Sequence, residues 1–273
     1  MGETAEESEK HTMSTIFIAP KGYTINNANP FTNDGNYDRT WTILAVDNRV
    51  EGMLFQKRSR LGCYAVSISP SYAFFNELLA DFIQYELDHD RKIILVSECD
   101  MNLNFKTHYK EARVRLSDPR FLIHSTTLPN YEKIIADGSL KSANRLRAEG
   151  FPVHPIGFEP LGEPDDYLDH IMFANGGAAP ELVVNSRLCG GANYNLHVPY
   201  TPQARLYFNG HKMVQNGIIV RNVASMVLDS VPLKDYLVKT ITANDLALPY
   251  GNSFWTPFSF AKSADEFMND FLF

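Results

Sequence analysis

The first 120 residues show short apolar runs broken by turn residues. The runs are rich in β-branched and aromatic side chains, which favours β-strands. They lie at residues 15–18, 41–46, 52–55, 63–68 and 92–96. From Tyr72 to about His89, apolar residues instead recur every three or four positions, which predicts a helix with one buried face that Ser69 or Ser71 can cap. We therefore predict a mixed α/β domain from Ser14 onward.

The pattern of apolar and polar residues changes near residue 120, where a predicted strand ends in polar residues. Residues 120–123 have strand character, and four polar side chains follow directly: His124, Ser125, Thr126 and Thr127. Thr127 and Pro129 favour the start of a short helix, and Gly138 stands where a helix needs a left-handed residue to end. The Gly- and Pro-rich stretch from Leu140 to Pro164 predicts a long loop.

The remaining residues predict further strands and two more helices. The expected strands lie at residues 170–174, 204–208, 217–220 and 225–228. Pro180 favours a short helix that runs to Arg187, and residues 212–217 read as a turn. Residues 263–273 form an amphipathic pattern, which predicts a helix that docks on the body through four apolar side chains: Phe267, Met268, Phe271 and Leu272.

These patterns predict an α+β protein of two domains. We expect an acidic, disordered lead at residues 1–13, an N-terminal α+β domain of unknown role at residues 14–119, and a C-terminal domain at residues 120–273. The 25 Lys and Arg against 32 Asp and Glu leave a net charge of −7, which argues against a nucleic-acid or anionic-membrane footprint over the whole surface. A local basic groove stays possible, and Lys57, Arg58 and Arg60 form either a solvated turn or a phosphate-facing patch.

Several functional classes are not favoured by the sequence. The apolar runs are too short to cross a bilayer, and the polar N-terminus is unlike a secretory signal, so we expect a cytoplasmic protein without a membrane partner. No H-E-x-x-H or other paired ligand spacing occurs, so no metal site is expected. Cys63, Cys99 and Cys189 are widely spaced, and Cys189 is expected to be a buried structural cysteine, with an activated thiol beside Arg187 as the alternative.

The segment from Ile123 to Leu140 resembles the first motif of the ADP-ribosyltransferase superfold. That motif has a histidine, a small residue, Ser or Thr, and a short helix that ends in Ile-x-x-x-Gly-x-Leu, and this chain matches it with Ile134, Gly138 and Leu140. In the superfold, the histidine and its neighbours hold the nicotinamide-side ribose of NAD. The resemblance implies that the C-terminal domain has an ADP-ribosyltransferase-like split β-sheet and binds NAD.

Two further stretches are similar to the RNA 2′-phosphotransferase branch of that superfold. Residues 170–190 resemble its second strand, helix and Val-Gly-x-Arg-x-Gly corner, with Arg187 at the arginine. Residues 206–237 parallel its Ile-Asp-Ala and Val-Pro-x-x-Tyr-Ile elements, so the resemblance covers about residues 121–240. The chain departs from the pattern where Asn209 replaces the aspartate. It also lacks the arginine before the second strand, for which Arg145 or Arg147 could substitute.

The resemblance implies roles for seven residues. The implied catalytic residues are His124, Arg187 and Arg145, and the implied NAD-binding residues are His124, Ser125, Thr126, His170 and Asn209. A histidine can bind a ribose hydroxyl by a hydrogen bond, and a guanidinium offers two coplanar N–H donors to a phosphate. The implied reaction is attack of an RNA 2′-phosphate on the NAD ribose with release of nicotinamide.

Other interpretations of the same residues remain open. The altered Asn209 also fits a module that binds NAD, ADP-ribose or RNA ends without catalysis. A third interpretation is an ADP-ribosyltransferase acting on protein or nucleic acid, although the late glutamate of those enzymes would fall near Arg205, a cation. The structural alternative is that His124 is a satisfied polar residue at a strand end and Arg187 a surface ion-pair residue.

Overall fold

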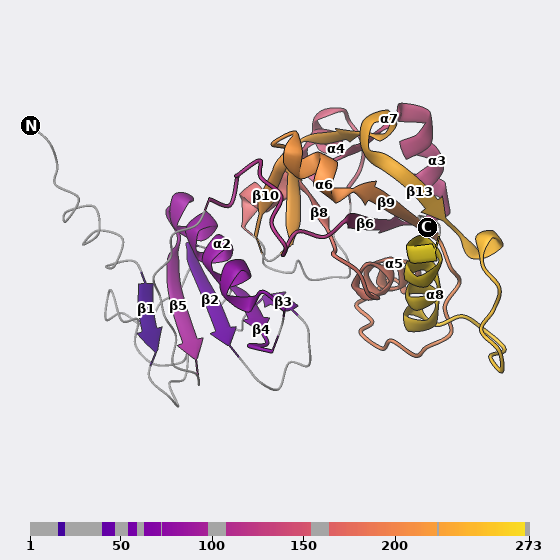
Figure 1. The fold of residues 1–273 in the computed structure, drawn as a ribbon, viewed down its shortest axis with the longest axis horizontal. Helices are drawn as coiled ribbons and strands as arrows, with labels where there is room; N and C mark the ends of the chain where they lie inside the picture. The colour runs from indigo at the N-terminus through magenta and orange to yellow at the C-terminus, as the bar shows by residue number, and fades with distance from the viewer. Residues whose placement is uncertain are drawn as a thin grey trace, which may run out of the picture. The chain divides into compact units, whose positions relative to one another are not determined.

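The chain forms a mixed α/β structure, as the sequence predicts. The computed structural model describes residues 16–19, 40–46, 54–58, 63–71, 73–97, 108–153, 164–222 and 224–270. The chain divides into two compact units (Figure 1). The N-terminal unit comprises Met1–Tyr109, Leu161–Asp165 and Arg221–Val223, and the C-terminal unit comprises Lys110–Pro160, Asp166–Val220 and Ala224–Phe273.

A five-stranded sheet of order β1-β5-β2-β4-β3 forms the N-terminal unit. Its strands are β1 (Ile16–Ala19), β2 (Trp41–Val46), β3 (Leu54–Arg58), β4 (Tyr64–Ile68) and β5 (Lys92–Ser97). Among the described strands of this sheet, only β3 runs antiparallel to its neighbour. The long helix α2 (Phe75–Asp88) carries the chain from β4 to β5, and both strands therefore run parallel to β2 between them. All five predicted strands and the helix are confirmed. Lys57 and Arg58 belong to the edge strand β3, and Arg60 lies outside the described residues.

The start of α2 differs from the prediction. The helix begins after Phe74, which adopts a left-handed conformation at φ 61°, and neither predicted serine caps it. The hydroxyls of Ser69 and Ser71 instead lie 2.7 Å apart and bond to each other. The apolar face of α2 is buried as expected, and its buried Glu86 carboxylate is paired with Arg91 at 2.7 Å and accepts a hydrogen bond from Thr42.

The described strands of the C-terminal unit form two three-stranded sheets and a two-stranded sheet. The first has the order β13-β9-β6, with β13 (Leu237–Ile241), β9 (Ala204–Asn209) and β6 (Phe121–Thr126), all antiparallel. The second has the order β10-β11-β8, with β10 (Ile219–Arg221), β11 (Ser225–Leu228) and β8 (His170–Phe173). The short pair is β12 (Ser230–Pro232) with β7 (Ser139–Lys141). A single bridge between Ile123 and Ala174 connects the first sheet to the end of β8.

Six α-helices and two short 3-10 helices complete the described part of the C-terminal unit. They are α3 (Leu128–Asp137), α4 (Ala143–Ala148), α5 (Ala179–Cys189), α6 (Gly210–Gln215), α7 (Leu233–Tyr236), α8 (Pro257–Asp270), η1 (Asp165–Asp169) and η2 (Ala243–Asp245). Because side chains alternate along β6, Leu122 and Ile123 enter different cores. Leu122 packs with Phe173 of β8, whereas Ile123 packs with Val184 of α5 and Phe260 of α8, two helices that lie side by side (Figure 1).

The predicted helix after Thr127 is confirmed, but three other sequence predictions are wrong. Helix α4 occupies part of the predicted loop, α6 replaces the predicted turn, and α8 begins at Pro257 instead of residue 263. Each of these three helices begins at a polar residue whose side chain accepts a hydrogen bond from a backbone N–H of the first turn. These caps are Ser142, Asn209 and Thr256, at 3.2, 2.9 and 3.0 Å. Residues 154–163 of the predicted loop, and Phe271 and Leu272 of the tail, lie outside the described residues.

Gly210 is required by a close approach between α6 and the chain that enters β6. Its N–H donates to the Arg120 carbonyl at 2.9 Å, and a Cβ at this position would overlap the carbonyl oxygen of Pro119 and lie 3.2 Å from Cγ of Leu122. We expect Gly210→Ala to lower the free energy of unfolding by about 1–3 kcal/mol. Gly191→Ala, with no atom within 4 Å of the added Cβ, is the control. Equal urea midpoints for the two variants would contradict this packing.

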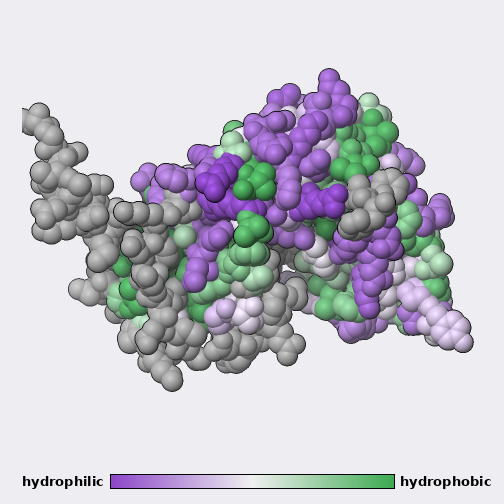
Figure 2. Space-filling model, viewed as in Figure 1, coloured by the Kyte–Doolittle hydropathy of each residue, from purple (hydrophilic) through white to green (hydrophobic). Residues whose placement is uncertain are grey.

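Hydrophilic side chains cover much of the visible face of the C-terminal unit, and hydrophobic ones form small scattered patches (Figure 2). Of the helices in the described part of the chain, none combines the length and apolar character that crossing a bilayer requires. Met268 is buried in the core beneath α8, and Phe267 packs against that core, so the tail helix docks on the C-terminal unit through these two predicted side chains.

Candidate functional site

The strands β6 and β8 separate immediately beyond their single bridge. The backbones of Ile123 and Ala174 exchange two hydrogen bonds of 2.9 and 3.0 Å, and beyond them each strand belongs to a different sheet. His124 is the next residue on β6, and its Nδ1 lies 3.4 Å from the Met172 carbonyl oxygen. We name this place the β6/β8 fork and define it by Ile123, His124, Met172 and Ala174.

His124 is a neutral imidazole at physiological pH. Burial lowers its pKa to about 4, the Met172 carbonyl opposes this shift, and the positive charge of Arg187 lowers the pKa further. With Nδ1–H donating to Met172, Nε2 keeps a lone pair that can accept a hydrogen bond. The edge-on contact of its ring with Phe173, at 6.1 Å between centroids, fixes the orientation of the imidazole.

Arg187 lies in the last turn of α5. Its positive charge lowers the pKa of His124, although the two residues come from different motifs of the sequence. Surrounding groups partly desolvate Arg187 and lower its pKa, while its side chain still meets solvent. The C-terminal unit thus has a neutral hydrogen-bonding ring at the fork and an accessible guanidinium whose charge lowers the pKa of that ring.

Ser125 and Thr126 extend β6 beyond the fork and point to opposite faces of the sheet. The buried Ser125 hydroxyl donates to Oε1 of Glu181 at 2.5 Å, so it serves the interior beneath α5. Thr126 is also buried and, two positions from His124, shares its face. Of these two predicted NAD-binding residues, only Thr126 has its side chain on the side of the fork.

A buried ionic network lies behind the fork, on the α5 and α8 side of β6. Arg205 of β9 and Glu181 of α5 are both fully buried and joined at 3.0 Å. Arg205 also bonds Asp265 of α8 at 2.7 Å and the Tyr207 hydroxyl at 2.7 Å, and Tyr200 donates to the second oxygen of Glu181 at 2.6 Å. Every oxygen of Glu181 therefore has a partner, and the network ties β9 and both helices together.

The network keeps its two tyrosines protonated. Burial raises the pKa of Tyr200, and the charge of Glu181 raises it further. Burial also raises the pKa of Tyr207, which donates to Asp265 at 2.7 Å. Sequence reasoning did not anticipate this network, although an arginine within the apolar run of β9 was a usable signal, because a buried guanidinium requires carboxylate partners.

Three other predicted site residues lie elsewhere in the C-terminal unit. His170 begins β8, four residues before Ala174, and its Nδ1 lies 2.9 Å from the Asp166 carbonyl oxygen. Arg145 projects from α4 and pairs with Glu149 at 2.6 Å and with Asp229 at 3.3 Å. These contacts do not support a role of Arg145 at the fork.

Asn209 is engaged as a helix cap. Its Oδ1 accepts the Lys212 N–H at 2.9 Å, at the end of β9. Asn209 is opposite Phe121 in the sheet, whereas His124 is opposite Leu206. Asn209 is therefore three residues along β9 from the row that contains His124, or about 10 Å at the rise of a strand.

Cys189 differs from its predicted burial. It is the last residue of α5 and is exposed, because the helix ends there before the left-handed Gly190. Cys63 is buried in the N-terminal unit, and Cys99 lies outside the described residues. Within the described ranges, no three His, Cys, Asp or Glu side chains are grouped to hold a metal ion.

We find no protein-family model, no curated protein and no solved structure that matches the chain. The function is therefore inferred from the residues at the fork and from the chemistry that they can perform.

His124 also makes stability depend on pH. An unfolded histidine has a pKa near 6.5, whereas folded His124 has a pKa of about 4, so the unfolded chain binds the extra proton between these values. We expect the contribution of His124 to stability to be complete above pH 6.5 and to fall by about 2 kcal/mol from pH 7 to pH 5. Urea unfolding followed by hydrogen–deuterium exchange of β6 peptides measures this loss.

Two substitutions isolate the contribution of His124. His124→Gln is expected to reduce the pH dependence by this amount, while His197→Gln, at an exposed histidine, leaves it unchanged. The assignment is refuted if the two variants lose the same stability between pH 7 and pH 5.

Proposed function

We propose that the C-terminal unit binds NAD at the β6/β8 fork and transfers its ADP-ribosyl group to a phosphate acceptor, as RNA 2′-phosphotransferases do. The observation that supports this proposal is the neutral, hydrogen-bonding His124 at the fork, whose pKa is lowered by the charge of Arg187 from a separate motif of the resemblance. The separation of β6 and β8 into two sheets after one bridge also supports this proposal, because the resemblance implies a split β-sheet.

The side chains at the fork suit the charges of this reaction. In the transfer, a phosphate oxygen forms a bond to the ribose carbon while the bond between that carbon and the nicotinamide nitrogen breaks. The electron pair of the broken bond leaves with the nicotinamide, which becomes neutral. Neutral His124 can accept a hydrogen bond from a ribose hydroxyl without adding positive charge beside the cationic sugar of the transition state. Arg187 can hold a phosphate through two parallel N–H donors.

The buried network bears on the choice of acceptor. In the alternative with a protein acceptor, a late glutamate would be expected near Arg205. Arg205 is instead a fully buried cation whose donors are occupied by Glu181 and Asp265. This favours a phosphate acceptor over the glutamate-dependent reaction.

A second candidate function is binding of NAD or ADP-ribose without transfer. The observation that favours it is that Arg145 is engaged by Glu149 and Asp229, and Asn209 by the α6 backbone. Of the three implied catalytic residues, His124 contacts the fork through Met172, and Arg187 is related to it only through the effect of its charge on the pKa of His124. A site with a single arginine stabilises a phosphate acceptor less than the family's site does, which has a further arginine before the second strand.

Nicotinamide release separates the two functions. The full chain is incubated with NAD and an RNA that carries a 2′-phosphate, and the same RNA without this phosphate is the control. Nicotinamide release that requires the 2′-phosphate supports transfer. Calorimetric binding of NAD or ADP-ribose without release supports the binding module, and the absence of both binding and release overturns both proposals.

A further inference from the structure

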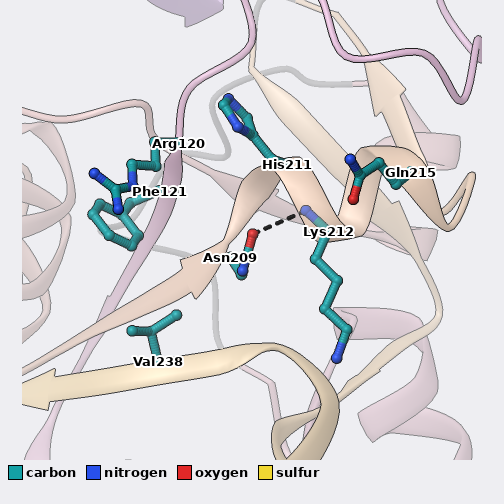
Figure 3. A pocket seen from close by; sticks show the side chains of 7 residues that line it. All are labelled: Arg120, Phe121, Asn209, His211, Lys212, Gln215 and Val238. Carbon is teal, nitrogen blue, oxygen red and sulfur yellow. Dashed lines mark hydrogen bonds between the residues drawn. The ribbon is translucent and has the colours of Figure 1, made fainter. Parts of the chain in front are cut away.

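A second concave site lies at the other end of β6 and β9. It is a pocket of about 460 Å³, which is within the range of small-molecule sites. It is lined by Arg120, Phe121, Asn209, His211, Lys212, Gln215 and Val238 (Figure 3). Arg120 and Lys212 stand on opposite sides of Asn209, and Val238 faces them from β13 (Figure 3).

The lining of this pocket carries positive charge and no carboxylate. The Arg120 guanidinium lies over the Phe121 ring at 5.5 Å from its centroid, which holds its planar donors in place. Lys212 Nζ donates to the Asp235 carbonyl at 2.7 Å, and a lysine ammonium has two more protons to donate. In a chain with a net charge of −7, this is a local site of the opposite sign.

The pocket is separate from the fork. Phe121 and His124 are three residues apart on β6, so their side chains lie on opposite faces of the sheet. The core assignments agree, because Phe121 packs against the α5 and α8 core whereas the His124 ring contacts Phe173 of the other core. A ligand in the pocket would therefore not occupy the position beside His124.

We propose that this pocket binds a phosphate group of a nucleotide or of an RNA strand. Arg120 would contribute a planar pair of donors, and Lys212 a second cation across the pocket. The Gln215 amide can donate to remaining phosphate oxygens, and the apolar surface of Val238 can contact a sugar or base. Because the proposal rests on this lining alone, it does not depend on the function of the fork.

The test uses two exposed cations of the pocket and two exposed cations outside it. Arg120→Gln and Lys212→Gln remove one charge each, and Lys234→Gln and Lys262→Gln do the same on α7 and α8. AMP and a fluorescent single-stranded RNA tetranucleotide are the probes, measured by calorimetry and by anisotropy. Each pocket variant is expected to weaken binding by about 10-fold, and to reduce the salt dependence of RNA binding by about 0.7 unit per charge.

The two probes distinguish the sources of the phosphate. Binding of AMP that the pocket variants weaken identifies a nucleotide site, and binding of the RNA alone identifies a strand site. Either result requires that Lys234→Gln and Lys262→Gln bind as the wild type does. Absence of binding to both probes, or equal losses in all four variants, overturns the proposal. In an Arg187→Gln protein, Arg120→Gln and Lys212→Gln should still weaken binding by about 10-fold, so failure of the pocket and failure of the fork are distinguishable.

Discussion

Glu181→Gln is expected to lower the free energy of unfolding of the C-terminal unit by about 3 kcal/mol. The substitution removes the charge that faces fully buried Arg205 at 3.0 Å, and breaking one side of a buried ion pair costs about 3–5 kcal/mol. The lower end applies because Asp265 still pairs with Arg205 at 2.7 Å. Urea unfolding followed by hydrogen–deuterium exchange of β6 and β9 peptides measures the change without interference from the N-terminal unit.

Glu266→Gln provides the matched control for this prediction. Glu266 lies on α8, one residue from Asp265, but it is exposed and pairs only loosely with Lys262 at 3.9 Å. Its loss is therefore expected to change stability by no more than about 1 kcal/mol. A Glu181→Gln protein as stable as the Glu266→Gln protein would show that the network does not hold α5 against β9.

Arg187→Gln is expected to weaken NAD binding by about 10- to 100-fold. The substitution removes charged hydrogen bonds to a phosphate, which contribute about 1.5–3 kcal/mol each, and keeps a side chain of comparable reach. Because Arg187 is exposed, the stability of the C-terminal unit should not change. Calorimetric titration with NAD at constant salt measures the affinity.

Arg147→Gln is the control for the loss of a positive charge. Arg147 is exposed on α4, and its Nη1 donates to the Asn144 side chain at 2.8 Å. Its substitution should leave NAD affinity unchanged. If both variants bound NAD as the wild type does, the fork would not be the NAD site, and the functional proposal would fail even with the fold intact.

The two predictions are linked through α5. Glu181 and Arg187 stand on the same helix, so the network that anchors its first turn also sets the position of its last turn. Glu181→Gln is therefore expected to weaken NAD binding as well as stability, whereas Arg187→Gln affects binding alone. This difference separates a positioning residue from one that touches the ligand.

Local patterns were sufficient for most of the elements around the fork. The strand that carries His124, the helix after Thr127 and its end at Gly138, with φ 72°, follow from side-chain alternation and a residue that tolerates a left-handed backbone. The helices α4 and α6 were missed because they are only six residues long, too short for a clear apolar period. Their capping residues, Ser142 and Asn209, were the available signals.

The sequence by itself determined the mixed α/β class, the identity of the strands and the resemblance that singled out His124 and Arg187, because these depend on neighbours along the chain. Only the tertiary structure decided that β6 and β8 part after one bridge, that the charge of Arg187 lowers the pKa of His124, and that Asn209 lines a separate pocket. It also decided that Arg205 is neutralised by Glu181 and Asp265. The physical reason is that strand pairing and helix docking are set by burial and charge compensation between segments far apart in the chain, which no local pattern records.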